Sequence, residues 1–386
     1  MQNGHGSTTQ RMNVAIIGCG RIGEREAEAA VAIPDLRLVA VSDIGPAFRD
    51  KAVRMGSKYE CDVVHEWRHL VARNDVHIVV VATPNAFHKD IAVEAMKNGK
   101  HVVVEKPLAS TLEDAEEMVL TAQRQGVKLM TNFNHRRHDH NFRTKQLIDQ
   151  GVIGRPLFVR GRIGHGRFVL GPSPASPGRL QAVNSWYMDA RQAGGGTVID
   201  NGVHLFDLAA WFMGDEFVEA QGAVTRNLDV CEFEADGRLR RVTPSDCEDN
   251  GFGLFTTRDG RVANLHSSWT QWQGYLHVEV FGTHGSIVVN NDQIQGYVSY
   301  QSFARHGEPF GTTTEVPALA KPDPSWRLQL EELAAAIREN RDPQPGGADG
   351  LRAMQMVDAL YRSSASGQTE RVHADGLGAA LEPVAR

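Results

Sequence analysis

Three side chains in the sequence, Lys106, Asp200 and His204, are of types that move a proton and steady a developing negative charge. Asp200 and His204 are four residues apart at the predicted start of a helix, so we expect them on one face, where the carboxylate can orient the imidazole. Histidine titrates near neutral pH, which suits a group that accepts and then returns a proton. The set therefore suits chemistry on a hydroxyl group. The alternative is a solvated helical pair and an exposed loop lysine.

A glycine-rich motif near the N-terminus predicts a dinucleotide site. Between a predicted strand and a predicted helix the chain spells G-x-G-x-x-G, that is Gly18, Cys19, Gly20, Arg21, Ile22 and Gly23. Such glycines let backbone N–H groups approach a pyrophosphate at the positive end of the helix dipole. Asp43 follows 20 residues after the last glycine, where a carboxylate can accept the ribose hydroxyls and repel a 2′-phosphate. No arginine follows Asp43 directly, and Arg49 is six residues further on, so NAD is favoured over NADP.

The two signals together predict hydride transfer. Oxidising a secondary alcohol with a nicotinamide needs a base for the hydroxyl proton and a cation to steady the alkoxide. Lys106 follows the fourth long predicted strand, at the sheet edge where a nicotinamide should lie. Our hypothesis is that His204 is the acid/base, that Asp200 is its partner, and that Lys106 positions the hydroxyl and lowers its pKa.

The elements that must position these groups change character along the chain. From residue 12 to about 133, continuous β-branched runs alternate with helical stretches, which predicts a doubly wound parallel sheet, a Rossmann domain. From 134 to 386 the strands alternate apolar and polar residues, so we expect an α+β domain with a large, mostly antiparallel open sheet for substrate binding and oligomerisation. Its closing helices, 326–340 and 348–364, are candidates to pack back on the first domain. The stretches 164–193 and 302–324 are predicted as long loops, and 1–11 as a disordered tail.

Further motifs suggest a family. The blocks Ala82-Thr83-Pro84-Asn85-Ala86-Phe87-His88, Glu105-Lys106-Pro107 and 193–208, with the glycine loop, resemble the Gfo/Idh/MocA oxidoreductases, and the resemblance runs from about 13 to 364. It implies a cis Lys106-Pro107 bond and catalytic roles for Lys106, Asp200 and His204. It also implies cofactor contacts in the first two blocks, namely Ala82, Thr83, Pro84, Asn85, His88, Glu105 and Lys106.

The substrate pocket is predicted more loosely. In the family, the histidine-dense segment 134–140 lines that pocket. Candidate contacts are Lys106, Asn134, Arg136 or Arg137, Arg162, His165, Trp186, Tyr187, Asp200 and His204, where an aromatic ring would suit the apolar face of a sugar or cyclitol. The alternative for 134–140 is a solvated helix start. We expect no metal site there, because adjacent arginines repel a cation and the family transfers hydride without a metal.

The predicted activity is that of an NAD-dependent dehydrogenase acting on CH-OH, at a ring hydroxyl of a sugar, amino sugar, nucleotide-linked sugar or cyclitol. One alternative is a redox-neutral epimerase, eliminase or glycosidase that recycles tightly bound NAD. Another is a non-catalytic dinucleotide-binding regulator, which should lack part of the catalytic set.

Composition limits the partners. The chain has 386 residues and a net charge of −6, so its overall balance attracts neither nucleic acid nor an anionic membrane. Four dispersed cysteines suggest no disulfide framework, and no apolar run is long enough to span a bilayer, so a cytoplasmic protein is expected. The open sheet predicts a homodimer or homotetramer.

Overall fold

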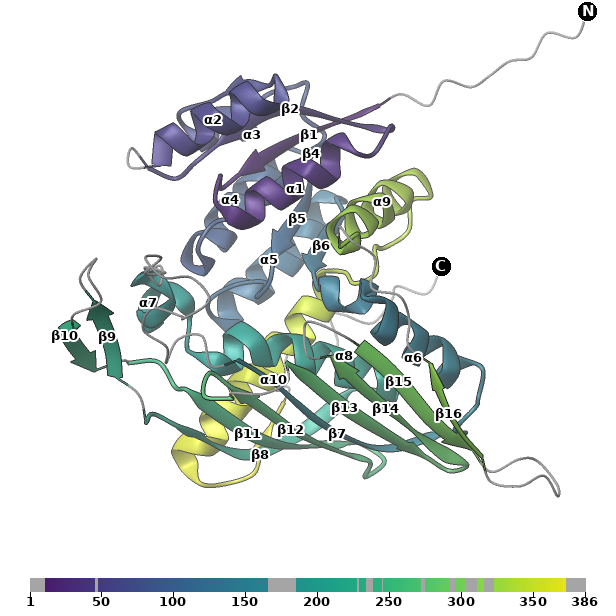
Figure 1. Ribbon diagram of the computed structural model, residues 1–386. Coiled ribbons are helices and arrows are strands. Elements are labelled where there is room, and N and C mark those ends of the chain that lie inside the picture. Colours follow the sequence, from purple (N-terminus) through teal and green to yellow (C-terminus); the bar gives the residue numbers. More distant parts are fainter. Residues whose placement is uncertain are drawn as a thin grey trace, which may run out of the picture.

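The computed structural model divides the chain between two sheets, one in each half (Figure 1). It describes residues 11–45, 48–165, 185–227, 229–233, 239–244, 246–271, 275–291, 296–302, 311–315 and 323–372. The predicted disordered tail, apart from Arg11, and most of the predicted loop 164–193 lie outside the described residues.

The first half forms a six-stranded parallel sheet in the order β3-β2-β1-β4-β5-β6. Its strands are β1 (Met12–Ile17), β2 (Leu36–Ser42), β3 (Asp62–Val63), β4 (Ile78–Val81), β5 (His101–Glu105) and β6 (Leu129–Asn132). The connecting helices are α1 (Arg21–Val31), α2 (Arg49–Tyr59), α3 (Trp67–Val71), α4 (His88–Lys97) and α5 (Leu112–Gln125). The order reverses at β1, so the carboxyl ends of β1 and β4 flank the crevice where such sheets bind ligands.

Both faces of this sheet are buried, as the continuous apolar runs predicted. In β1, Ala15 and Ile17 pack into the cluster that holds Ile91 of α4, whereas Val14 and Ile16 pack into the cluster that holds Ala27 of α1. Successive side chains of a strand point to opposite faces, and here each face has a helical cover. The predicted doubly wound domain is therefore confirmed.

The second half contains a nine-stranded sheet in the order β16-β15-β14-β13-β7-β12-β11-β8-β17. Every neighbouring pair is antiparallel except β7 with β12. The strands are β7 (Pro156–Gly164), β8 (Phe217–Thr225), β11 (Asn250–Thr257), β12 (Val262–Ser268), β13 (Leu276–Gly282), β14 (Gly285–Asn291), β15 (Gly296–Ser302), β16 (Gly311–Glu315) and β17 (Glu370–Arg371), and a separate hairpin joins β9 (Asp229–Phe233) to β10 (Leu239–Pro244). The predicted α+β class is confirmed.

Helices cover one face of this large sheet. They are α6 (Asp139–Asp149), α8 (Val203–Met213) and α10 (Gly347–Ser366), and they lie between the sheet and the first domain (Figure 1). Helix α9 (Ser325–Arg338) crosses to the other half, where Leu330 and Leu333 join the core cluster of β1 and α1. The predicted loop 302–324 is partly wrong, because residues 311–315 form the edge strand β16.

Candidate active site

The glycine loop joins β1 to α1, and the space around its three glycines differs. Gly18 has a φ of +105°, and a Cβ there would lie 2.4 Å from the Ala82 carbonyl oxygen. A Cβ on Gly23 would lie 1.8 Å from the Gly18 carbonyl oxygen. A Cβ on Gly20, the N-cap of α1, would meet no atom within 4 Å in the part of the chain that the structure describes. Protein packing therefore requires the first and third glycines, whereas the middle one leaves the helix N-terminus open to a ligand, and the loop fits a bound pyrophosphate.

Asp43, which follows β2, is tied to this loop. Its carboxylate oxygens accept hydrogen bonds from the backbone N–H groups of Cys19 and Ile44, both at 2.8 Å. Burial raises the pKa of Asp43, and the two N–H donors partly offset that shift. The carboxylate thus lies beside the glycine loop at the carboxyl end of β2, where a ribose would be recognised.

Two residues predicted as cofactor contacts mainly hold loops together. His88 is fully buried, and its ring nitrogens lie 2.9 Å from the Pro107 carbonyl oxygen and 3.0 Å from that of Thr83. Asn85 donates a hydrogen bond of 2.8 Å to the carbonyl of Ala193, at the end of the short helix α7 (Ala190–Ala193). They link the loops after β4 and β5 to each other and to the second domain.

Lys106 and Asp200 meet between the two domains. Lys106 directly follows Glu105, the last residue of β5, and its peptide bond to Pro107 is cis, as the resemblance implied. Its Nζ lies 3.0 Å from Asp200 Oδ1 and 2.8 Å from the Asp200 carbonyl oxygen. The other carboxylate oxygen, Oδ2, accepts the indole N–H of Trp269 at 3.1 Å. Asp200 itself lies in a π turn (Val198–Gly202) that runs directly into α8.

Each partner keeps the other charged. Burial alone lowers the pKa of Lys106, but the charge and hydrogen bond of Asp200, together with Tyr187 and Tyr275, make the net shift upward. Burial alone raises the pKa of Asp200, but the charge and hydrogen bond of Lys106, together with His165 and the N–H of Trp269, make the net shift downward. The side chains are 19 % and 13 % exposed, so a reactant can still reach the ammonium.

His204 lies in the first turn of α8 and is buried, with 5 % of its surface exposed. Its Nδ1 has no hydrogen-bond partner among the described residues, so the expected support of the imidazole by Asp200 is absent. The carboxylate instead accepts from the ammonium of Lys106 and the indole N–H of Trp269, one on each oxygen. Burial lowers the pKa of His204 well below its usual range, and the positive charge of Lys106 adds to that shift. The imidazole is therefore neutral at rest, and one of its nitrogens carries a lone pair.

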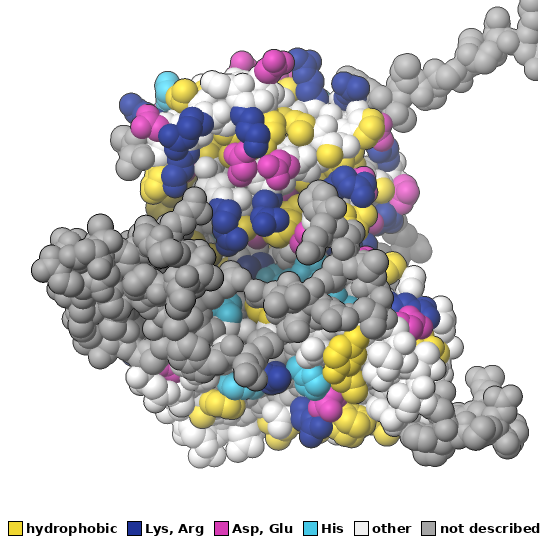
Figure 2. Space-filling view, in the orientation of Figure 1, with side chains coloured by type: hydrophobic (Ala, Val, Ile, Leu, Met, Phe, Trp, Pro, Cys, Tyr) yellow, Lys and Arg dark blue, Asp and Glu magenta, His cyan; other side chains and the backbone are white. Residues whose placement is uncertain are grey.

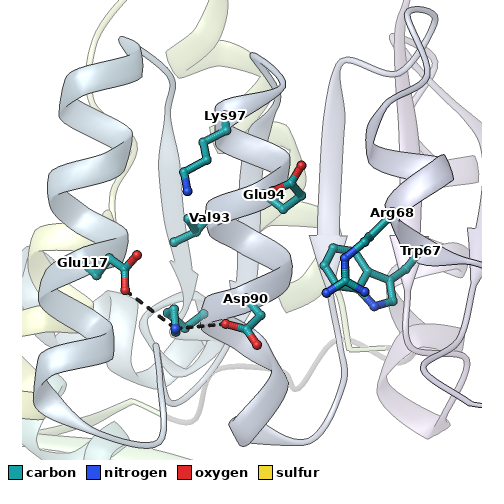
Figure 3. A pocket seen from close by; sticks show the side chains of 8 residues that line it. Trp67, Arg68, Asp90, Val93, Glu94, Lys97 and Glu117 are labelled. Atoms are coloured by element: carbon teal, nitrogen blue, oxygen red, sulfur yellow. Dashed lines mark ion pairs between the residues drawn. The ribbon is translucent and has the colours of Figure 1, made fainter.

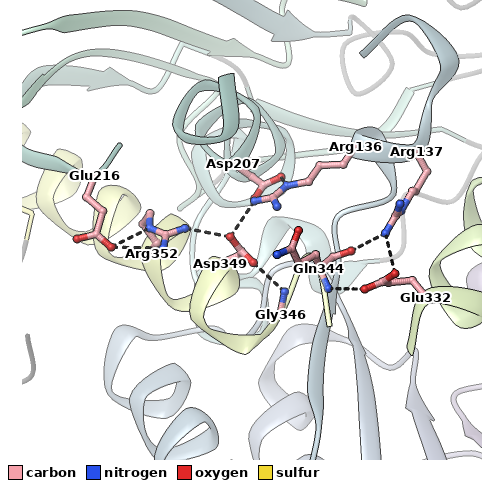
Figure 4. Close-up of polar contacts among 9 residues, drawn as sticks. All are labelled: Arg136, Arg137, Asp207, Glu216, Glu332, Gln344, Gly346, Asp349 and Arg352. Carbon is pink, nitrogen blue, oxygen red and sulfur yellow. Dashed lines mark hydrogen bonds and ion pairs between the residues drawn. The ribbon is translucent and has the colours of Figure 1, made fainter. Parts of the chain in front are cut away.

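Two of the residues predicted to contact substrate bond instead to other side chains of the protein. Arg136 is buried and makes a bidentate pair with Asp207 of α8, its Nε lying 2.8 Å from Oδ2 and its Nη2 2.5 Å from Oδ1 (Figure 4). The same Nη2 donates to Asp349 of α10 at 2.9 Å. Asn134 donates to the hydroxyl of Ser325 at 3.1 Å. We therefore assign structural roles to these two side chains. Arg136 was predicted to contact substrate because its carboxylate partners are distant in sequence and could not be identified there.

Strand direction corrects another prediction, that of Arg162. Gly161 of β7 faces α8, since a Cβ there would lie 2.8 Å from Leu205. Because strand side chains alternate, Arg162 points to the opposite face of the sheet, where it is exposed and paired in register with His266. His165, beyond the strand end, lies on the site side, with its Nε2 3.4 Å from Asn201 Nδ2 and its charge acting on Asp200.

The remaining aromatic candidates lie close to the ion pair. Trp186 and Tyr187, in the turn η4 (Ser185–Met188), stack with ring centroids 3.8 Å apart. Burial raises the pKa of Tyr187, and Asp200 contributes to that shift through its charge. Sequence reasoning missed Trp269 and Tyr275, because a lone aromatic beside a strand end carries no signal before the register of the sheet is known.

Histidine side chains gather in the band between the two domains (Figure 2). Among the described parts of the chain, no group of three or more histidine, cysteine or acidic side chains could hold a metal ion.

A surface groove of about 310 Å³ lies elsewhere, on the outer side of α3, α4 and α5 (Figure 3). It is lined by Trp67, Arg68, Lys89, Asp90, Val93, Glu94, Lys97 and Glu117, none of them a predicted site residue. In the described helices, none is long and apolar enough to cross a membrane.

The fold and the glycine loop define an NAD-binding oxidoreductase, and comparison with known proteins agrees. Residues 12–133 match the family model described as "Oxidoreductase family, NAD-binding Rossmann fold", and 142–288 match the GFO/IDH/MocA C-terminal domain. The chain belongs to the Gfo/Idh/MocA family. The resemblance noted in the sequence and the prediction of NAD as cofactor are confirmed.

Relatives of full length are found among curated proteins. The chain is 28 % identical to levoglucosan dehydrogenase of Pseudarthrobacter phenanthrenivorans, over 92 % of this chain and 97 % of the relative. It is 29 % identical to myo-inositol 2-dehydrogenase of Thermotoga maritima, over 91 % and 96 %. The solved structure of levoglucosan dehydrogenase with NADH and L-sorbose shares the fold, with a TM-score of 0.83 at 24 % identity, covering 94 % of this chain and 99 % of that one.

Proposed function

We propose that this protein catalyses the reversible NAD-dependent oxidation of a secondary ring hydroxyl of a sugar or cyclitol to a ketone. The observation that carries the proposal is the pair of Lys106 and Asp200 with His204 beside it. A charged ammonium and a neutral, buried imidazole at the carboxyl edge of a dinucleotide-binding sheet are the two groups that alcohol oxidation requires. The curated names of its relatives, a levoglucosan and a myo-inositol dehydrogenase, support this substrate class.

The residues divide the work as follows. Lys106 binds the substrate oxygen through its ammonium and stabilises the alkoxide that forms as the proton leaves. His204 accepts that proton on an imidazole nitrogen and returns it in the reverse direction. Asp200 holds Lys106 charged and in place, and Trp269 fixes the carboxylate. NAD, when bound, supplies the acceptor for the hydride from the carbinol carbon.

Asp43 and the glycine loop would hold the dinucleotide, with the pyrophosphate at the N-terminus of α1 and the ribose at the carboxylate. Asp43→Asn keeps one oxygen acceptor, enough for the N–H of Cys19 but not also for that of Ile44, and removes the charge that repels a 2′-phosphate. We expect this variant to bind NAD more weakly and to lose part of its preference over NADP. Unchanged affinities for both cofactors would contradict the role of Asp43.

The catalytic assignment is tested with three variants and a substrate screen. A panel of free sugars, inositols and nucleotide-linked sugars is offered with NAD while NADH absorbance is followed. Lys106→Met and His204→Asn should each lower kcat about 10²- to 10⁴-fold, the usual contribution of a positioned acid or base. Lys89→Met is the control, because that lysine pairs with the surface carboxylates of Asp90 and Glu117 in the outer groove. Normal turnover in either site variant would refute the assignment, and product formation without NADH would indicate a redox-neutral cycle.

We also propose self-association through the open face of the large sheet. Phe158 of β7 and Phe252 and Leu254 of β11 are 42–47 % exposed there, on strands whose other face is covered by helices. Large exposed apolar side chains on one face are typical of an interface. Light scattering should give a dimer or tetramer, and a monomer at micromolar concentration would contradict this.

A further inference from the structure

Two histidine rings lie face to face in the site. His135 belongs to the turn η3 (Asn134–Arg137) and His204 to the first turn of α8, and their ring centroids are 3.8 Å apart with the planes at 7°. Each side chain is only 5 % exposed, and the Nδ1 atom of neither has a hydrogen-bond partner among the residues described. The stack therefore joins two segments 69 residues apart through their ring faces alone.

The turn η3 holds α8 at a second point. Arg136, the next residue, binds Asp207, which lies one helical turn after His204. The pair is buried, and Arg136 also reaches Asp349 of α10 (Figure 4). The stack of His135 on His204 and the ion pair of Arg136 with Asp207 are two contacts on successive turns of α8. Together they restrain the plane of the His204 imidazole and the rotation of the helix.

Both imidazoles are held neutral by their surroundings. Burial lowers the pKa of His135 well below its usual range, and His204, His138, Lys106 and His140 add to the shift. The groups that act on His204 are Lys106, which follows β5, and His138, which lies between η3 and α6, and Lys106 is itself paired with Asp200. On its other sides His135 meets the ring of His138 and the Tyr275 hydroxyl, 3.4 Å from Nε2. His138 in turn lies 3.6 Å from Asp323.

A neutral ring stacked on the acid/base has a consequence for the reaction. When the substrate O–H bond breaks, the proton goes to a nitrogen of His204 and the imidazole becomes an imidazolium. The face of a neutral aromatic ring attracts such a cation, by about 0.5–2 kcal/mol in proteins. The proton stays on His204 during hydride transfer and passes to water before the next turnover, which restores the neutral imidazole.

We infer that His135 is a positioning residue for His204: its ring fixes the plane of the His204 imidazole and stabilises the positive charge that His204 gains during turnover. Only the stabilisation of the positive charge rests on the proposed function. The fixed plane of the imidazole concerns the resting protein and can be tested without a substrate.

The test compares two side chains of similar volume in place of His135. His135→Phe keeps an aromatic face and loses the ring nitrogens, whereas His135→Leu keeps apolar packing and loses the ring. His284→Phe is the control, because that histidine is exposed at a turn beyond β13. If His135→Leu does not fold, His135→Gln replaces it as the variant without a ring.

Two readouts are used. In NMR spectra of histidine-labelled protein without substrate, the His204 ring proton, assigned by its loss in His204→Asn, should keep its upfield ring-current shift in His135→Phe and lose it in His135→Leu. In turnover, His135→Phe should stay close to wild type, while His135→Leu should lower kcat about 2- to 30-fold at an unchanged KM for NAD, which is the range of the cation–π attraction at about 1.4 kcal/mol per tenfold.

The outcomes distinguish failure of the His135 inference from failure of the proposed function. An unchanged His204 shift in His135→Leu overturns the inference, whatever the activity. Equal losses of kcat in the Phe and Leu variants also overturn it, because they would give the ring nitrogens of His135 a direct role. A lost shift in an enzyme that oxidises no sugar or cyclitol leaves the positioning intact and refutes the proposed function instead.

Discussion

The glycine loop allows a sharp test of cofactor binding, because two glycines of one motif should respond in opposite ways to the same change. In Gly20→Ala the new methyl group meets no atom of the described residues within 4 Å, and the φ of −78° suits any residue. In Gly23→Ala the methyl group would lie 1.8 Å from the carbonyl oxygen of Gly18. We therefore expect the first variant to fold normally and the second to be destabilised by about 1–3 kcal/mol, the usual result of overpacking.

The loss of cofactor affinity in Gly20→Ala can be worked out from the contacts at stake. The methyl group stands at the N-cap of α1, where a pyrophosphate must approach the backbone closely. A hydrogen bond to a charged group contributes about 1.5–3 kcal/mol, so losing one should weaken NADH binding about 10- to 150-fold.

Two measurements suffice. Thermal unfolding without cofactor should give Gly20→Ala the Tm of wild type and Gly23→Ala a lower one. Titration calorimetry with NADH should give Gly20→Ala the weaker Kd. Wild-type affinity in Gly20→Ala would refute the reasoning, because the dinucleotide would then not approach this loop.

Two further predictions concern buried charges. Glu26 and Glu105 share Asn132, whose Nδ2 lies 2.6 Å from a carboxylate oxygen of each, and burial raises the pKa of both carboxyls. Because the folded pKa is raised, the wild-type protein loses stability as pH rises from about 4.3, the unfolded pKa, through the folded pKa. The Tm of Glu26→Gln should therefore exceed that of wild type at pH 8 but not at pH 4. A Tm difference that is the same at both pH values would contradict this. Arg136→Met leaves Asp207 buried without its partner and should cost about 3–5 kcal/mol in urea unfolding, whereas a cost below about 1 kcal/mol would show that the pair is not a major restraint.

The first domain could be predicted from sequence because its signals are local. β-branched runs, a glycine turn and an acidic residue at fixed spacing lie within one βαβ unit. The large sheet was predicted only in part, because β15 and β16 carry glycine, serine and threonine rather than apolar alternation. Their strand character comes from pairing within the sheet, of β15 with β14 and of β16 with β15, which composition does not reveal.

Residue types and spacing named the charged members of the site, but not their partners. The spacing of Asp200 and His204 suggested a direct contact, yet Asp200 instead pairs with Lys106, 94 residues away. Arg136 looked like a ligand for a hydroxyl or phosphate until Asp207 and Asp349 were found beside it. Which groups meet across domains is decided by tertiary packing, and a single sequence does not encode it in any short pattern.

The position of β7 bears on how the chain is made. This strand pairs with β12 on one side and β13 on the other, about 100 residues later, and α9 completes the core of the first half. During synthesis, a ribosome must therefore extend the chain past residue 268 before β7 has its first neighbour, past 282 before it has both, and past 338 before α9 can cover the first domain. Non-local pairing of this kind slows folding. Nascent chains stopped short of these points should expose unpaired strand edges and depend on chaperones until synthesis ends.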